Sequence, residues 1–171
     1  NPVVLHKNIV AEMMSVKTKN EIQGFQKSFE KLDIVLENFK KRIKLGLSEF
    51  ELNQIFEEEI FKTGAKALTF KTILSIGENT ASIHYSSYDK NKTLKKDDLI
   101  LLDCGGYWDS PLACDITRVF TGGQPTSKQK YVYTVVLKTF LNCYYSNFEK
   151  GFEIDNLARK LFKKYNIEGF E

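Results

Sequence analysis

Two aspartates, Asp103 and Asp115, are the side chains of this sequence whose types and spacing best suit chemistry. Asp103 directly follows the apolar run Leu99-Ile100-Leu101-Leu102, and a carboxylate at the end of a buried strand is costly unless it has a partner. Asp115 begins a second strand-like stretch that ends at Phe120. A β-hairpin over 99–120, with its tip near Asp109, predicts that the two carboxylates pair side by side.

Neighbouring carboxylates repel one another unless a cation lies between them. Hard divalent ions such as Mn²⁺ prefer carboxylate ligands, and two bridged ions can activate a water and polarise a carbonyl together. The alternative interpretation is structural: Asp103 is a turn residue before Gly105-Gly106, and Asp115 forms an ion pair with Arg118. Arg118 lies at an odd offset from Asp115, so it is expected on the other face of the strand.

The stretch before the hairpin is expected to supply two helices and two strands. Apolar residues spaced by three and four predict a helix over 20–44. Ser48 and Glu51 form a capping-box pattern that begins a second helix, and Gly64 ends it. The period then changes, and 70–76 and 81–85 are predicted as strands.

After the hairpin, the Gly-Gly-Gln-Pro sequence at 122–125 ends the predicted strand. Thr126 and Gln129 form a second capping-box pattern, which predicts a helix to about Phe148. A last helix is expected over 154–165. With no internal repeat and no linker, one domain or part of one is the simplest interpretation.

Composition narrows the classes of function. The 171 residues are 42% apolar and 27% charged, with a net charge of +3, which does not favour a nucleic-acid partner. No apolar run is long enough to cross a bilayer, and the first residues lack the layout of a signal peptide. The three cysteines, each interpreted as a small buried apolar residue, have no framework spacing, which favours a reduced, cytoplasmic compartment.

Two stretches of the predicted hairpin form a recognisable pattern: Asp103-Cys104-Gly105-Gly106-Tyr107, and then Asp115-Ile116-Thr117-Arg118-Val119-Phe120. This pattern resembles the signature hairpin of the Xaa-Pro aminopeptidases. Three other segments agree in order: 19–25, 70–85 with its Ile83-His84-Tyr85, and 123–138. The sequence is thus similar to the pita-bread metallopeptidases, a group that also contains prolidase, methionine aminopeptidase and creatinase.

The resemblance implies a role for three residues. Asp103 would bind one metal ion, Asp115 would bridge two, and His84 would contact the substrate near the scissile bond. Without the resemblance, a lone histidine between Ile83 and Tyr85 is more often a hydrogen-bonded core residue. His6 has no motif around it and is interpreted as structural or surface. The resemblance favours two Mn²⁺ ions as cofactors, with Co²⁺ or Zn²⁺ as alternatives.

The fold implied is α+β: the first part of a pita-bread fold, a curved antiparallel sheet with helices on its outer face. Residues 1–171 would be the N-terminal part of the catalytic domain, truncated, without the preceding domain or the C-terminal part. The family needs one His and two Glu ligands more, expected beyond residue 171. The chain alone is therefore predicted to be inactive. It is also predicted to be poorly soluble or only partly folded, because apolar strand surface and an open sheet edge would be exposed.

The function implied for the full-length protein is removal of the N-terminal residue from peptides with proline second. Alternatives are a prolidase, a methionine aminopeptidase, or a non-catalytic pita-bread protein that binds peptides or serves as a scaffold. A homodimer is expected for the full-length protein. One departure bears on the site: the Asp103–Asp115 spacing is one residue longer than is common in the family. An extra residue at the tip or in a bulge keeps the two strands in register.

Overall fold

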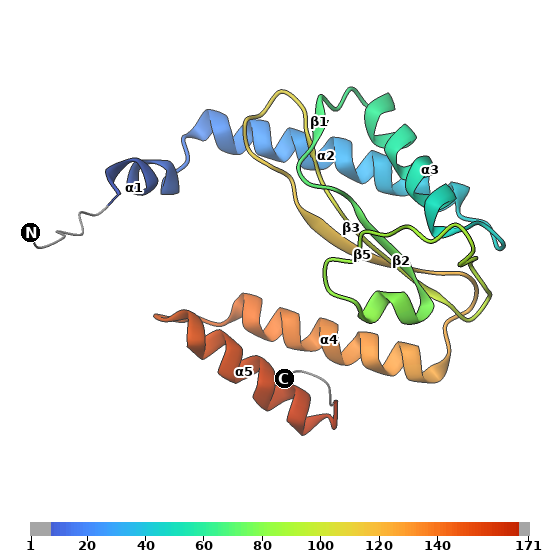
Figure 1. Ribbon diagram of the computed structural model, residues 1–171. Coiled ribbons are helices and arrows are strands. Elements are labelled where there is room, and N and C mark those ends of the chain that lie inside the picture. Colours follow the sequence, from blue (N-terminus) through green and yellow to red (C-terminus); the bar gives the residue numbers. More distant parts are fainter. Residues whose placement is uncertain (1–7, 168–171) are drawn as a thin grey trace, which may run out of the picture. The chain divides into compact units, whose positions relative to one another are not determined.

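The computed structural model describes residues 8–167, which form two compact units, one ending at Gly123 and the other beginning at Gln124 (Figure 1). His6, interpreted above as structural or surface, lies outside the described residues. The first unit contains the three candidate residues for chemistry, Asp103, Asp115 and His84. In chain order its helices are α1 (Ile9–Ser15), α2 (Lys19–Arg42), α3 (Glu49–Lys62) and the short 3-10 helix η1 (Gly77–Ala81). Its strands are β1 (Ala67–Leu68), β2 (Ile73–Ile76), β3 (Leu99–Cys104), β4 (Gly106–Tyr107) and β5 (Ile116–Thr121).

The two long helices begin at capping boxes and bury one apolar face. Thr18 caps α2 and Ser48 caps α3, each accepting a hydrogen bond from the backbone N–H three residues later. Along α2 the buried apolar residues recur at helical spacing: Leu32, Val35, Leu36 and Phe39. The predictions of a helix over 20–44 and of a capped helix from Ser48 are confirmed.

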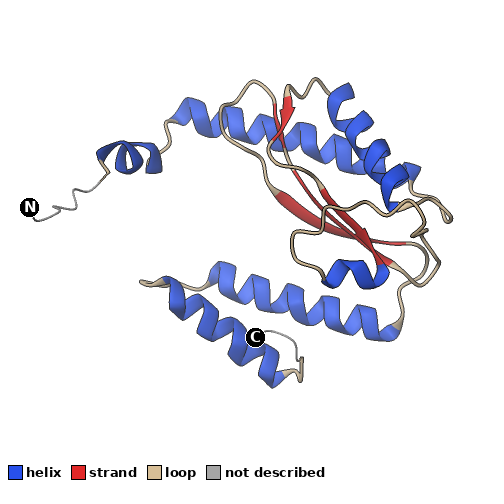
Figure 2. Ribbon diagram, viewed as in Figure 1, coloured by secondary structure: helices blue, strands red, loops and turns tan. Residues whose placement is uncertain are grey.

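The sheet of the first unit has three antiparallel strands in the order β2-β3-β5. A separate two-stranded ladder joins β1 to β4, and pairs Ala67 with Tyr107. Figure 2 shows α2 and α3 lying together across one face of the three strands. Phe39 on α2 links the layers, since its ring contacts Phe56 on α3 at 5.9 Å and Phe120 on β5 at 5.5 Å between centroids.

The two faces of β3 differ in burial. Ile100, Leu102 and Cys104 are fully buried in the core that α2 and α3 cover. The alternate residues Leu99, Leu101 and Asp103 are half-buried on the opposite face. The run thus forms a strand with one fully buried face and one half-buried face, and Asp103 lies on the half-buried face.

The second unit is a pair of helices, α4 (Ser127–Tyr145) and α5 (Gly151–Lys164). Thr126 and Gln129 form the expected capping box of α4. The Tyr131 hydroxyl donates to the carbonyl of Tyr165 at 2.8 Å, and so ties the start of α4 to the end of α5. Both predicted helices are confirmed, with α5 beginning earlier than expected.

The segment predicted as a strand over 81–85 is not one. The chain turns through η1 and then runs as a loop in which His84 and Tyr88 have positive φ angles of 56° and 43°. Positive φ is uncommon for residues other than glycine, so this path is held by the surrounding structure. Among the described residues, no helix is both long and apolar enough to cross a membrane.

Candidate active site

Asp103 lies at the end of β3, between the two other strands of the sheet. It is opposite Ile73 of β2 on one side and Thr117 of β5 on the other. The Thr117 hydroxyl donates a 2.9 Å hydrogen bond to Oδ1 of Asp103. This bond fixes one carboxylate oxygen and leaves the other for a further partner.

The predicted pairing of Asp103 with Asp115 is wrong by two residues. Asp103 pairs with Thr117, and Asp115 lies just before the first residue of β5. The reason is that the segment after β3 does not continue the hairpin: β4 leaves β5 and pairs with β1 instead. Asp115 stays on the face of Asp103, because it precedes Thr117 by two residues and side chains alternate along a strand.

Gly105 brings the chain before Asp115 into close approach with the end of β3. A Cβ atom at Gly105 would overlap the carbonyl oxygen of Cys114 and would lie 2.7 Å from its carbonyl carbon. The Thr69 hydroxyl donates to the same carbonyl oxygen at 3.0 Å. Because Cys114 immediately precedes Asp115, these contacts set where the second carboxylate begins.

A pocket of about 480 Å³ brings all three predicted site residues together. Its walls are formed by Phe70, Lys71, Ile73, His84, Ser86, Asp103 and Asp115. The ammonium of Lys71 donates to the carbonyl of Ser86 at 2.7 Å and lies 5.0 Å from the centre of the Tyr88 ring. The pocket thus has two carboxylates, one imidazole, one ammonium and an apolar wall.

Sequence reasoning missed Thr117, Lys71 and Ser86. The position of Thr117 in the site could have been predicted from the sequence, because a residue two positions after Asp115 lies on the same face of the strand as Asp115. Lys71 and Ser86 gave no such signal. Their meeting depends on the loop that carries His84, which was predicted as a strand.

The buried thiol next to Asp103 is unsuited to nucleophilic chemistry. Burial, and then the negative charge of Asp103, raise the pKa of Cys104 to about 12. Its Sγ lies on the core face and donates a weak hydrogen bond to the Ile116 carbonyl. Cys104 is therefore a core residue, as the sequence predicted.

The donors of the pocket fit part of a site for hard divalent cations. Asp103 and Asp115 supply carboxylate oxygens on one sheet face, and the Thr117 hydrogen bond orients one of them in the way that metal ligands are commonly held. Within residues 8–167, no group of three or more His, Cys, Asp or Glu side chains is arranged to hold a metal ion. Two ligands thus account for only part of a metal site.

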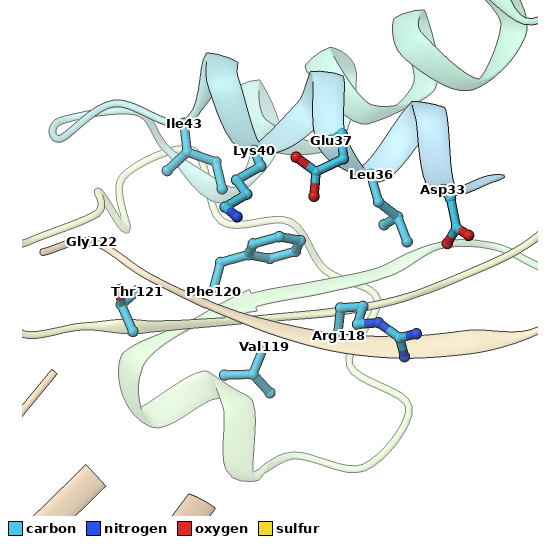
Figure 3. Close-up of a pocket in the computed structure, with 10 residues that line it drawn as sticks. All are labelled: Asp33, Leu36, Glu37, Lys40, Ile43, Arg118, Val119, Phe120, Thr121 and Gly122. Carbon is cyan, nitrogen blue, oxygen red and sulfur yellow. The ribbon is translucent and has the colours of Figure 1, made fainter. Parts of the chain in front are cut away.

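A second pocket, of about 540 Å³, lies between α2 and β5 (Figure 3). Asp33, Glu37, Lys40 and Arg118 give it charges of both signs, and Phe120 points from β5 toward the helix. Arg118 lines this pocket, whereas Asp115 lines the other, so the alternative in which the two residues simply form an ion pair is not supported. With no histidine and balanced charge, this larger pocket is less suited to metal chemistry than the smaller one.

The chain is similar to proline-specific peptidases in sequence and in fold. The model of metallopeptidase family M24 matches residues 23–171, and the chain therefore belongs to that family. It is 28% identical to the Xaa-Pro dipeptidase of Pyrococcus furiosus over 161 residues, which cover 92% of this chain and 45% of that protein.

Two solved structures illustrate the similarity of the fold. The Xaa-Pro dipeptidase from Bacillus anthracis has a TM-score of 0.83 and 27% identity, covering 93% of this chain and 44% of that one. The X-Pro aminopeptidase from Thermotoga maritima has a TM-score of 0.82 and 24% identity, covering 93% and 44%. The fold is thus the first part of a pita-bread fold, as expected, and the chain spans less than half the length of these relatives.

Proposed function

We propose that the full-length protein is a metal-dependent aminopeptidase that releases the N-terminal residue from Xaa-Pro peptides. The observation that carries the proposal is the pocket in which Asp103, Asp115 and His84 meet, in a chain of the M24 family. In this proposal, residues 1–171 are the N-terminal part of the catalytic domain, and one His and two Glu elsewhere in the protein complete the ligands.

Each residue of the pocket has a separate role in the proposed reaction. Asp103 and Asp115 bind cations through carboxylate oxygens, and Thr117 holds Asp103 in one orientation. His84 contacts the substrate carbonyl, where an imidazole N–H stabilises developing negative charge. Phe70 and Ile73 supply an apolar wall against which a proline ring can pack. Two bound divalent ions, which we propose to be Mn²⁺, would supply an activated water and a Lewis acid for the carbonyl.

Hydrolysis assays on the full-length protein test the proposal. Wild type is compared on an Xaa-Pro-Xaa tripeptide, with and without added Mn²⁺, against Asp103→Asn, Asp115→Asn and His84→Asn. Asp109→Asn is the matched control, because Asp109 lies between the two ligands in sequence yet is exposed and ion-paired with Lys66 and Lys31.

We expect Mn²⁺-dependent cleavage before proline, at least about 100-fold loss in the three pocket variants, and wild-type rates in the control. Peptide binding by a wild-type protein that does not cleave would instead indicate a non-catalytic member of the family. Full activity in Asp103→Asn would refute the assignment of the ligands.

A dipeptidase is the second candidate, favoured by the similarity to the Xaa-Pro dipeptidase of Pyrococcus furiosus. The same assay on an Xaa-Pro dipeptide distinguishes the two, because an aminopeptidase prefers the tripeptide. We also propose a reducing, cytoplasmic location, since Cys104, Cys114 and Cys143 are all free thiols. A homodimer of the full-length protein is likewise proposed and is tested by light scattering.

A further inference from the structure

Glu49 is a fully buried carboxylate that neither the sequence pattern nor the pocket singles out. It is the first residue of α3, and none of its surface is accessible to solvent. Because a buried carboxylate is costly without partners, its hydrogen bonds show what the fold uses it for.

Four donors satisfy the two oxygens of Glu49. Oε1 accepts from the backbone N–H of Ile76 at 2.8 Å and from the side-chain amide of Asn79 at 3.0 Å. Oε2 accepts from the Tyr85 hydroxyl at 2.6 Å and from the backbone N–H of Asp89 at 2.9 Å. Every bond is donated to the carboxylate, so its role depends on its being an acceptor at both oxygens.

These four donors bracket His84 in sequence. Ile76 ends β2, Asn79 lies in η1, Tyr85 directly follows His84, and Asp89 closes the loop. Burial, with the hydrogen bond to Glu49, raises the pKa of Tyr85 to about 12, so its hydroxyl stays protonated and able to donate. The Glu49 side chain thus binds both ends of the loop. It also binds Tyr85, the neighbour of His84, whose φ angle is positive.

Capping of α3 does not explain this arrangement. The N-cap Ser48 already forms a complete capping box with Glu51, whose carboxylate accepts from the Ser48 backbone N–H and hydroxyl at 2.8 Å each. The bonds of Glu49 run instead to residues 27 to 40 positions away in sequence. Its contacts therefore order the loop, in addition to any effect on the helix start.

We propose that Glu49 is a positioning residue, which fixes the loop over 77–89 so that His84 enters the pocket beside Asp103 and Asp115. The inference rests on the proposed function for the role of His84, but the ordering of the loop can be measured independently of activity. A substitution at Glu49 should therefore act on the loop first and on catalysis through His84.

The test is Glu49→Gln in the full-length protein. Glutamine has nearly the same shape, but its NH₂ group cannot accept a hydrogen bond. In either orientation of the amide, the NH₂ group would face a backbone N–H, that of Ile76 or that of Asp89. Glu59→Gln is the matched control, because Glu59 is also buried on α3 but pairs with Arg42 and Lys62, away from the loop. Tyr85→Phe removes a single one of the four bonds, and serves if Glu49→Gln does not fold.

Hydrogen–deuterium exchange and kinetics are then measured on the same preparations. We expect exchange over 77–89 to rise by about 10- to 100-fold in Glu49→Gln relative to Glu59→Gln, and to rise less in Tyr85→Phe. We expect kcat/KM on the Xaa-Pro substrate to fall by roughly 10-fold or more relative to Glu59→Gln, and by less than about 2-fold when His84→Asn is already present.

Equal exchange over the loop in Glu49→Gln and Glu59→Gln would overturn the proposal. So would an equal loss of kcat/KM with and without His84. A third outcome is a wild-type protein that cleaves no Xaa-Pro peptide, with faster exchange over the loop in Glu49→Gln than in Glu59→Gln. That outcome would support the ordering of the loop by Glu49 and would overturn the proposed function instead.

Discussion

Replacement of Gly105 by alanine should disturb both the fold and the candidate metal site. The new Cβ would overlap the carbonyl oxygen of Cys114 and lie 2.5 Å from Oγ1 of Thr69, whereas ordinary contacts begin at 3.4 Å. Two of the clashing atoms belong to the backbone of Cys114, so rotation of a side chain cannot relieve the overlap. The segment leading to Asp115 must then move by on the order of 1 Å.

The expected cost in the free energy of unfolding is about 2–3 kcal/mol, as for overpacking in a tight core. Denaturant titration of the full-length protein measures it, and calorimetric titration with Mn²⁺ measures the accompanying loss of metal affinity. Gly151→Ala is the matched control, because nothing lies within 4 Å of the added Cβ at the start of α5. A Gly105→Ala variant within about 0.5 kcal/mol of wild type would refute the account of this close approach.

Three further predictions concern single side chains. Thr117→Val removes the donor to Asp103 and should weaken Mn²⁺ binding by roughly 10- to 100-fold in calorimetric titration. Hydrogen bonds from Lys62, and then from Arg42, lower the pKa of Glu59 below its ordinary value of 4.5. The stability that these bonds contribute is therefore fully present above about pH 4.5, and it is lost as the pH falls through the lowered pKa. Glu59→Gln should therefore flatten the acid side of the stability–pH profile. Cys104, buried with a pKa near 12, should resist iodoacetamide at pH 8 in the folded protein, as read by mass spectrometry.

Each of these predictions has a control in the same chain. Thr121→Val changes the same residue type at the far end of β5, and should leave metal binding unchanged. Glu58→Gln removes a more exposed carboxylate near the same basic side chains, and should change the acid profile less. Cys143, which is only partly buried, should be alkylated first. Equal effects in variant and control, or early alkylation of Cys104, would contradict the respective prediction.

Local signals in the sequence predicted most of the elements. The capping boxes at Ser48 and Thr126 are confirmed because they depend on residues only three positions apart. The helix over 20–44 was recognisable for a similar reason, since its apolar stripe repeats at helical spacing. Asp103 and Asp115 were singled out by their positions around the predicted hairpin, whereas their separate roles as metal ligands, and the choice of His84, came from the family resemblance.

The errors fall where a distant partner decides the local structure. Apolar and polar residues alternate over 81–85, as in a strand. The chain nevertheless forms a loop there, in which the Tyr85 hydroxyl donates a hydrogen bond to the distant Glu49. The register of β5 departs from a symmetric hairpin because β4 pairs with β1, which is far away in sequence. Pairing between distant segments has no local signal, so neither the loop nor the register could be predicted from spacing.

Metal content is the most direct test of the central claim that the pocket of Asp103 and Asp115 is part of a metallopeptidase centre. The full-length protein and its Asp115→Asn and Asp109→Asn variants are loaded with Mn²⁺, desalted and measured by plasma mass spectrometry. The account predicts stoichiometric metal in wild type and in Asp109→Asn, and strongly reduced metal in Asp115→Asn. Wild-type metal content in Asp115→Asn would contradict it.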